Sequence, residues 1–563
     1  MTPLMMAARA GQAECVKALL FVSDDRQTDE KGLSAVFYAA RGGSLDCLSQ
    51  FSPFSSLDVE GDATRINGRT LLMAAAVFHG EDTRCLQLLL PMSNPSHQDE
   101  DGITALSYAA AHGRAAAVAL LLPLTDRSLR AKGKWAGQTV FHLAAGSLDL
   151  ETIRLALPFF DPQETDGAGR TALMSACSTH QNSAYGRADE DEKCLSTLRF
   201  LAPLSDVSAR SGGKGSDLDW SAMALLSQHN RPKSISWLAA FCAPDGARLN
   251  NGETPLMLAV RRGNADAIAA LLPLSDANAQ DNQGQTALHG AVIQQQADAA
   301  RALLACPALD PNLRDQKGTT ALMRAVCSPG HDFMAMILSL GAGLRANVKN
   351  NDGRTALMLA AETGDAQKTN LLIPDSDCDL RDNEGRTALD IAIAEASEEC
   401  LPGLMRATDL LAANPQDGRT PLHLATKSCV PDLFLKILAQ CPPEATRSQD
   451  NWGLTPLMFA LTQRYESDAR ALAPLSDISQ RDHKGRTALD HLISSASFGL
   501  LDALLAAVPD DQLQATLLEF AAKCAPVSAA RLEAIDLARD AGIGSTANPE
   551  DPDPLAPSNP RRI

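Results

Sequence analysis

Three histidines at matching places are the residues best suited to acid/base or metal chemistry. His142, His289 and His423 each follow a threonine by three positions. Imidazole can transfer a proton near neutral pH and can bind zinc. In equivalent segments of the same chain, however, this position is held by Met257 or Met323, which can do neither. We therefore interpret the three histidines as structural and expect neither a catalytic residue nor a metal ligand.

A glycine-rich loop is the second place where chemistry is conceivable. Residues 211–216 read Ser-Gly-Gly-Lys-Gly-Ser, which resembles the composition of a phosphate-binding loop. Such a loop requires Ser or Thr directly after the lysine, and Gly215 follows Lys214. The kinase glycine-rich loop and the HRD and DFG segments are also missing. We interpret this loop as a connector and expect no enzyme activity and no cofactor.

Cysteine usage points in the same direction. The 13 cysteines are scattered singly, without a CxxC pair or a Cys/His grouping at zinc-ligand spacing. Most, such as Cys15 and Cys85, lie in apolar stretches. This pattern favours reduced thiols in the core of a cytoplasmic protein.

Composition limits the remaining classes of function. The 563 residues exceed one hydrophobic core, and only 4% are aromatic, which favours packed helices of Leu and Ala over a sheet. The net charge of -18 disfavours nucleic acids and anionic membranes as partners. No apolar run reaches the ~18 residues that span a bilayer, so we expect no membrane insertion.

A repeated unit dominates the sequence. It reads Asp-x-x-Gly-x-Thr-Ala/Pro-Leu-x-x-Ala-Ala, followed by a polar turn and a second apolar segment ending in Leu-Leu. Thr can cap the first helix, Pro suits its first turn, and Leu with the Ala pair forms one apolar face. The glycine recurs at Gly32, Gly68, Gly102, Gly137, Gly169, Gly252, Gly284, Gly318, Gly353, Gly385, Gly418, Gly453 and Gly485.

These motifs resemble the ankyrin-repeat family, with its Thr-Pro-Leu-His at residues 420–423, over nearly the whole chain. The resemblance implies an all-α solenoid of about sixteen helix-turn-helix units with short β-hairpin fingers. In several copies Pro replaces the family's usual Gly-Ala-Asp after the second helix, as at Pro123 and Pro273.

The repeat pattern predicts the domain boundaries. We expect a repeat array over 1–508, a degenerate C-terminal capping repeat over 509–542 and a disordered Pro-rich tail over 543–563. The chain opens inside a repeat at Thr2. We expect that residues upstream are missing; cover by another chain or domain is the alternative. An insertion over 181–193, a glycine-rich loop and a repeat without a finger glycine predict a weak joint at about 178–222.

The fingers supply the candidate binding residues. The resemblance implies that finger tips and first helices line a concave groove, so we expect the variable tips to contact partner proteins. They are Asn282, Gln283, Gln316, Lys317, Asn451, Trp452, His483 and Lys484. Trp452 has no core role in the repeat, and Trp is enriched at binding hot spots; packing on an adjacent finger is the alternative.

An arginine recurs directly after the finger glycine, for example at Arg69, Arg170 and Arg419. It either balances the finger aspartates or forms a ladder that recognises acidic segments of a partner.

We therefore expect a protein-binding scaffold or adaptor with protein partners. The alternative is the targeting array of a larger kinase-type signalling protein whose catalytic part lies upstream or in trans. We expect a cytoplasmic location, with the cytoskeleton or nucleus as alternatives. We also expect a monomer, unless the uncapped N-terminal edge self-associates.

The weak joint yields a first testable prediction. Because the stability of a repeat array sums local and nearest-neighbour terms, limited proteolysis should cut first between about 178 and 222. A stable C-terminal fragment should remain, identified by intact-mass spectrometry. Early cuts spread evenly along the array would contradict a localised joint.

Overall fold

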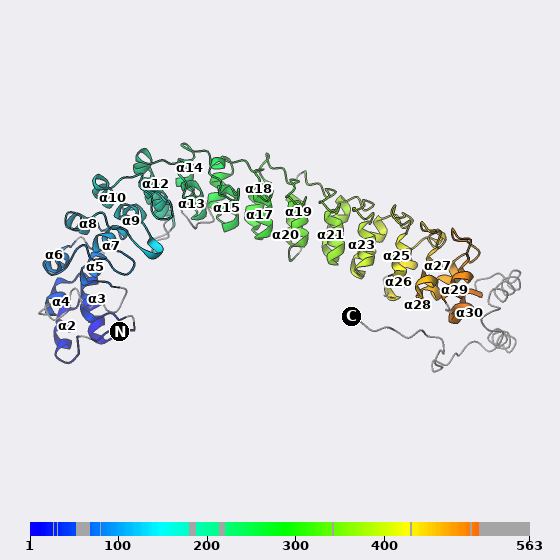
Figure 1. Ribbon diagram of the computed structural model, residues 1–563, viewed down its shortest axis with the longest axis horizontal. Helices are drawn as coiled ribbons and strands as arrows, with labels where there is room; N and C mark the ends of the chain where they lie inside the picture. Colours follow the sequence, from blue (N-terminus) through cyan, green and yellow to red (C-terminus); the bar gives the residue numbers. More distant parts are fainter. Residues whose placement is uncertain are drawn as a thin grey trace. The chain divides into compact units, whose positions relative to one another are not determined.

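The computed structural model describes residues 1–505, except 26, 31, 52–67, 79, 81, 179–186, 213–219, 331, 341–342, 428–430 and 496–497. The chain divides into two compact units, Met1–Asn351 and Asp352–Ile563, each made of successive helix pairs (Figure 1). The spacing of the finger glycines continues across this boundary, so the repeat pattern did not indicate it. The capping repeat and tail expected after residue 508 lie outside the described residues.

Each repeat contributes a first and a second helix, and the first helices run from the finger toward the polar turn. In the first unit they are α1 (Pro3–Arg9), α3 (Ala35–Arg41), α5 (Leu71–Ala76), α7 (Ala105–Ala111), α9 (Val140–Ser147), α11 (Ala172–Cys177), α13 (Ala222–Gln228), α15 (Pro255–Arg262), α17 (Ala287–Ile293) and α19 (Ala321–Cys327). In the second unit they are α21 (Ala356–Thr363), α23 (Ala388–Ala394), α25 (Pro421–Lys427), α27 (Pro456–Gln463) and α29 (Ala488–Ser495).

The second helices return from the turn. They are α2 (Ala13–Leu20), α4 (Leu45–Gln50), α6 (Arg84–Leu89), α8 (Ala115–Leu121), α10 (Leu150–Ala156), α12 (Arg187–Leu201), α14 (Pro232–Leu238), α16 (Ala265–Leu271), α18 (Ala297–Leu304) and α20 (Asp332–Leu340) in the first unit. The second unit has α22 (Ala366–Leu372), α24 (Leu401–Ala407), α26 (Pro431–Leu438), α28 (Glu466–Leu472) and α30 (Leu501–Leu505).

The core is a row of small and aliphatic side chains between neighbouring repeats. First helices pack on first helices, as α13 on α15, and second helices on second helices, as α14 on α16. In α15, Leu256, Ala259 and Val260 are fully buried. Alanine at these positions allows helices to approach closely. The predicted all-α solenoid is confirmed for each unit.

Proline ends many second helices and begins a 3-10 turn there, because its ring fixes φ and removes an N–H group. Pro203 and Pro474 occupy such turns. The turns of this kind are η2 (Leu90–Met92), η4 (Leu157–Phe159), η5 (Ala202–Leu204), η7 (Ile373–Asp375) and η10 (Ala473–Leu475). Further 3-10 turns are η3 (Gly133–Trp135), η6 (Pro244–Gly246), η8 (Glu398–Cys400), η9 (Pro443–Arg447) and η11 (Phe498–Leu500).

The fingers are tight turns closed by the residues that the repeat pattern indicated. In one of them, the Gly318 amide donates to the Asp315 carbonyl at 2.8 Å and the Asp315 amide to the Thr319 carbonyl at 2.9 Å. All 13 predicted finger glycines have φ between 72° and 81°. Across the described fingers, pairing amounts to isolated antiparallel bridges at Thr28–Ser34, Thr165–Thr171 and Arg210–Ser221.

Part of the predicted insertion is helix. Residues 181–193 are an insertion in the repeat pattern, and insertions in repeat arrays usually form surface loops. In the structure, however, α12 begins at Arg187; residues 179–186 lie outside the described part. The buried Asp191 accepts hydrogen bonds from the Lys233 amide at 2.8 Å and the Ser234 hydroxyl at 2.6 Å. This carboxylate therefore caps α14, which the charge-rich sequence 187–193 did not suggest.

The three histidines join adjacent repeats. The Nδ1 atom of His289 accepts from the Thr286 amide at 3.3 Å, so Nε2 carries the proton and donates to the Thr319 carbonyl at 3.0 Å. His142 and His423 make the same contacts, reaching the carbonyls of Arg170 and Leu454. Both ring nitrogens are engaged and the rings are buried. The structural interpretation of these histidines is confirmed.

A finger glycine can be tested by adding one methyl group. In Gly284→Ala, the new Cβ would lie 2.9 Å from the Gln316 amide nitrogen, on a backbone with φ of 75°. We expect a loss of ~1–2 kcal/mol from the left-handed backbone, and more from the displaced finger. Urea unfolding followed by circular dichroism measures it.

Gly246→Ala is the matched control, because nothing in the described structure lies within 4 Å of its Cβ. Its unfolding midpoint should stay near that of the parent protein. Equal midpoints for the two variants would contradict the close approach of neighbouring fingers.

The buried histidines predict a pH dependence. Burial lowers the pKa of His142, His289 and His423 below the ordinary 6.5, although the hydrogen bond to the carbonyl partly offsets it. Below about pH 6.5 the unfolded chain therefore binds protons that the folded chain does not, and stability falls from pH 7 to pH 5.

Replacing all three with Met, the residue that other repeats use, should flatten this dependence in urea titrations at pH 5, 6 and 7. At pH 7 the variant should be less stable by about 1 kcal/mol for each lost hydrogen bond. If the free energy of unfolding of the variant falls between pH 7 and pH 5 as steeply as that of the parent, the three histidines take up protons equally in the folded and unfolded chains, which contradicts the prediction.

Candidate functional site

The finger tips are connected by backbone hydrogen bonds from one repeat to the next. In each case the amide after the finger aspartate, or after the residue in its place, donates to a tip carbonyl of the preceding finger. In the first unit these bonds are Lys132 to Asp101 (2.6 Å), Gly167 to Ala136 (2.9 Å), Asn282 to Asn251 (2.9 Å), Gln316 to Gln283 (2.9 Å) and Asn351 to Lys317 (3.1 Å). In the second unit they are Asn383 to Asp352 (3.1 Å), Asn451 to Asp417 (2.9 Å) and His483 to Trp452 (3.2 Å). We call these contacts the tip ladder.

Side-chain amides of the tips reinforce the tip ladder. The Asn282 amide donates to the Asn250 carbonyl at 2.9 Å, and the Gln316 amide to the Asn282 carbonyl at 2.7 Å. Asn451 reaches the Gln416 carbonyl at 3.0 Å. Asparagine and glutamine at the tips thus have a structural role, which the sequence analysis did not assign to them.

All eight predicted binding residues are exposed, and the structure brings them together in two groups. One lies in the first unit, where two adjacent fingers carry Asn282, Gln283, Gln316 and Lys317. The other lies in the second unit and consists of Asn451, Trp452, His483 and Lys484. The amides of Asn282, Gln316, Asn451 and His483 serve the tip ladder, whereas the ammonium groups of the lysines and the Trp452 ring do not.

Each finger aspartate organises its own turn. One carboxylate oxygen accepts backbone amides: Asp315 Oδ1 accepts from Lys317 at 2.9 Å and from Thr319 at 2.8 Å. The other oxygen is satisfied in several repeats by a donor nine residues later. These pairs are Tyr38 with Asp29 (2.7 Å), Tyr108 with Asp99 (2.7 Å), Arg324 with Asp315 (2.7 Å) and His491 with Asp482 (3.0 Å).

The arginines after the finger glycine pair with these aspartates. Arg170, Arg386 and Arg486 bind the aspartate of their own finger at 2.8–2.9 Å. Burial raises the pKa of Asp482, but hydrogen bonds from the Arg486 amide and guanidinium outweigh burial, and the pKa falls to about 2. These three arginines balance charge within the repeat, as one of the two sequence interpretations proposed.

Arg419 is arranged differently, because Asn414 takes the place of the finger aspartate in a finger that is one residue longer. Its Nη1 atom lies 3.6 Å from Oδ2 of Asp417 in the same finger. Its guanidinium lies between two aromatic rings, 4.6 Å from the centroid of Phe459 and 5.4 Å from that of Trp452. Its Nε atom is 3.9 Å from Asp450 Oδ2. Both atoms are buried and have no hydrogen-bond partner in the described structure. The Trp452 side chain covers this pair and remains 54% exposed.

Sequence reasoning found Trp452 but missed the group around it. The signals were the substitution of the finger aspartate by Asn414 and of the usual ninth-residue donor by Phe459. Because the finger aspartate is replaced, the Arg419 guanidinium lies near Asp450 of the next finger. Because Phe459 cannot donate a hydrogen bond, Oδ2 of Asp450 has no hydrogen-bond partner in the described structure.

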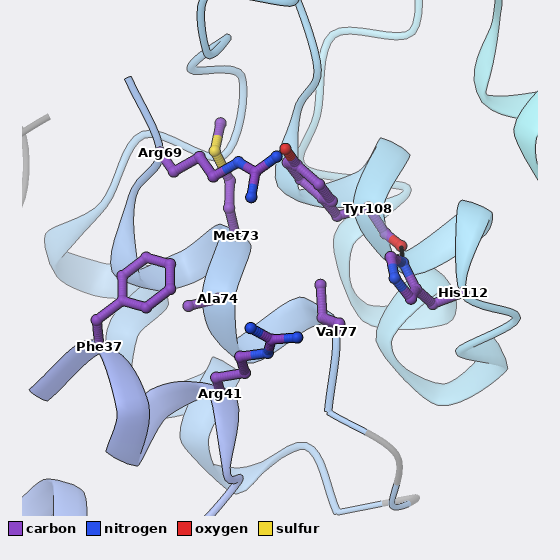
Figure 2. Close-up of a pocket in the computed structure, with 8 residues that line it drawn as sticks. All are labelled: Phe37, Arg41, Arg69, Met73, Ala74, Val77, Tyr108 and His112. Atoms are coloured by element: carbon purple, nitrogen blue, oxygen red, sulfur yellow. Dashed lines mark hydrogen bonds between the residues drawn. The ribbon is translucent and has the colours of Figure 1, made fainter. Parts of the chain in front are cut away.

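A pocket of about 210 Å³ lies between the first helices α3, α5 and α7. It is lined by Phe37, Arg41, Arg69, Met73, Ala74, Val77, Tyr108 and His112. Figure 2 shows Arg69 extended toward Tyr108 and Arg41 extended toward Val77, with Met73 and Ala74 of α5 between them. The guanidinium carbon of Arg69 is 5.1 Å from the centre of the Tyr108 ring.

Other chemistry finds little support in the described part of the chain. There, no group of three His, Cys, Asp or Glu side chains could hold a metal ion, and no helix has the length and hydropathy to cross a membrane. Burial raises the pKa of Cys85 to about 11, which keeps this thiol protonated. Cys15, expected in the core, is exposed. Lys214 lies outside the described residues.

Comparison with known proteins agrees with the repeat geometry. The family model described as "Ankyrin repeats (3 copies)" matches residues 1–54, 54–128, 221–315, 270–347 and 322–414, together more than half of the chain. Neurogenic locus notch homolog protein 1 of Xenopus laevis is 32% identical over 173 residues, covering 30% of this chain and 7% of the relative. Rabankyrin-5 of Homo sapiens is 25% identical over 217 residues, covering 36% of this chain and 18% of the relative. The chain thus spans only a small part of each relative.

Glycine fingers in register, Thr-capped first helices, histidines that join repeats and the family match lead to one conclusion. The chain belongs to the ankyrin-repeat family, whose repeats generally mediate protein–protein interactions.

Proposed function

We propose that this protein is a scaffold or adaptor, not an enzyme, and that it binds partner proteins through its finger tips and first helices. A cytoplasmic location and a monomeric state are parts of the same proposal. The net charge of -18 favours protein partners over nucleic acids. No observation on the structure favours the alternative of a kinase-type protein's targeting array.

The observation that carries the proposal is the exposed Trp452 stacked on Arg419. A large ring that is 54% exposed contributes little to folding, yet it is held in place by a cation below it. Tryptophan loses little conformational entropy on binding when it is already held, which is why such rings serve as hot spots.

Each of the two groups of tip residues also carries a lysine, Lys317 in the first unit and Lys484 in the second. Lys317 and Lys484 are exposed and form no ion pair with any residue that the structure describes. Their backbone amides bind Asp315 and Asp482, so the turns hold their side chains at the tips. A basic tip next to a ring suits a partner with acidic residues at the rim of its contact surface.

The test begins with affinity capture of partners from cell lysate and mass spectrometry, followed by calorimetry with the purified partner. Replacing Trp452, Lys317 and Lys484 together with Ala should leave the melting temperature nearly unchanged, because exposed substitutions usually cost within ~0.5 kcal/mol. Binding should weaken by ~2 kcal/mol or more if one of them is an anchor.

The control variant combines Leu475→Ala, Arg199→Ala and Arg406→Ala, which remove an exposed apolar side chain and two exposed cations away from the tips and the first helices. It should bind like the parent protein. If the tip variant binds with unaltered affinity, the tips are not the site, and the 181–193 segment becomes the first place to search.

A further inference from the structure

The pocket between α3, α5 and α7 contains two arginines whose positive charge the described residues neutralise only in part. Arg69 is 39% exposed, and its Nε atom is 3.8 Å from Asp99 Oδ2. That carboxylate is fully buried and already accepts hydrogen bonds from the Ile103 amide at 2.8 Å and the Tyr108 hydroxyl at 2.7 Å. Arg41 is exposed in the last turn of α3 and pairs with no residue in the described part of the chain.

Other repeats show what normally faces such a cation. The residue after the finger glycine and the residue eight positions later lie close enough to form an ion pair. In one repeat Glu253 binds Arg261 at 3.1 Å, and in another Arg354 binds Glu362 at 2.7 Å. In these two repeats the charge of the arginine is thus neutralised by a carboxylate of the same repeat.

In the pocket both partner positions are apolar. Arg69 has Val77 eight residues later, and Arg41 has Leu33 eight residues earlier. The two guanidinium groups therefore lie over an apolar floor in a protein whose net charge is -18. Two arginines next to Phe37, Val77 and Tyr108 suit a carboxylate beside an aliphatic side chain, since guanidinium binds carboxylate through paired hydrogen bonds.

We propose that this pocket binds a glutamate or aspartate side chain from an extended acidic segment of a partner protein, with Arg41 and Arg69 as the cations. The inference rests on the proposed function and adds a recognition site in the first unit, separate from the tips around Trp452. A volume of about 210 Å³ equals about seven waters at ~30 Å³ each, which is room for one side chain and not for a folded element.

The experiment uses the full chain and a fluorescein-labelled peptide of alternating Glu and Leu. Fluorescence anisotropy at low salt measures its affinity, and a Gln-for-Glu peptide is the neutral comparison. We expect the Glu peptide to bind at least ten times more tightly than the Gln peptide. Arg41→Glu should weaken Glu-peptide binding at least tenfold. Arg262→Glu, an equal charge change at an exposed site on α15, should alter it less than threefold.

Val77→Glu is the second variant. It places a carboxylate at the partner position of Arg69, as Glu362 does for Arg354, and should block the pocket from within. We expect it to abolish Glu-peptide binding while the unfolding midpoint stays unchanged or rises, so lost binding cannot be attributed to lost folding. Equal binding of the Glu and Gln peptides, or parent-like binding by both pocket variants, would overturn the proposal.

Further measurements distinguish recognition of a carboxylate from recognition of a phosphate, and binding at the pocket from binding at the tips. Inorganic phosphate at constant ionic strength should displace the Glu peptide no better than acetate; preferential displacement by phosphate would overturn the assignment to a carboxylate. The Trp452, Lys317 and Lys484 variant should bind the peptide normally. If the peptide binds regardless of Arg41 while captured partners depend on Trp452, only the pocket is wrong. If no partner protein is captured, the proposed function fails independently.

Discussion

The hydrogen bond between successive finger tips is the interaction on which the rest of each unit depends. A single helix pair cannot bury its apolar face, and it becomes stable only when the next pair lies against it at a fixed distance. The tip amide of one finger sets that distance by donating to a carbonyl of the preceding finger. A left-handed glycine is required beside this contact, because a Cβ at Gly137 would lie 2.4 Å from the Gly167 amide nitrogen. Helix stacking and the carbonyl contacts of the histidines follow from the same spacing.

The tip ladder also decides which residues remain for recognition. Asparagine and glutamine at the tips look like free polar contacts in the sequence, yet their amides bind the neighbouring finger. Three of the six arginines after the finger glycine are likewise bound to the aspartate of their own finger. Recognition is then left to side chains whose usual intramolecular partner has been replaced. Trp452 packs on Arg419, whose usual finger aspartate is replaced by Asn414, and Arg41 faces no carboxylate among the described residues.

Much of the fold could be predicted from the sequence because the repeat pattern encodes local geometry. Gly284 or Gly318 is required by a positive φ and Thr286 by a helix cap, and each of these signals lies within a few residues. His289 bonds a carbonyl of the next repeat, 30 residues away, and could be predicted because the repeat spacing is regular. The capping of α14 by Asp191 of α12 could not be predicted, because the two lie more than 40 residues apart in the sequence. The pocket and the Arg419 group were missed for a similar reason. Each forms between repeats, where one repeat has lost a usual partner residue and a side chain of the neighbouring repeat lies against the residue that remains.

Amide hydrogen exchange in the free protein, resolved to single residues, tests the central role of the tip ladder most directly. The amides of Asn282, Gln316 and Asn451 belong to exposed residues, but each donates to the preceding finger. The account predicts that these amides exchange as slowly as helix amides of the same repeats, and that Gly284→Ala removes the protection at Gln316. Exchange of the three amides at the rate of an unstructured chain would contradict it, because the fingers would then be positioned by the helices alone.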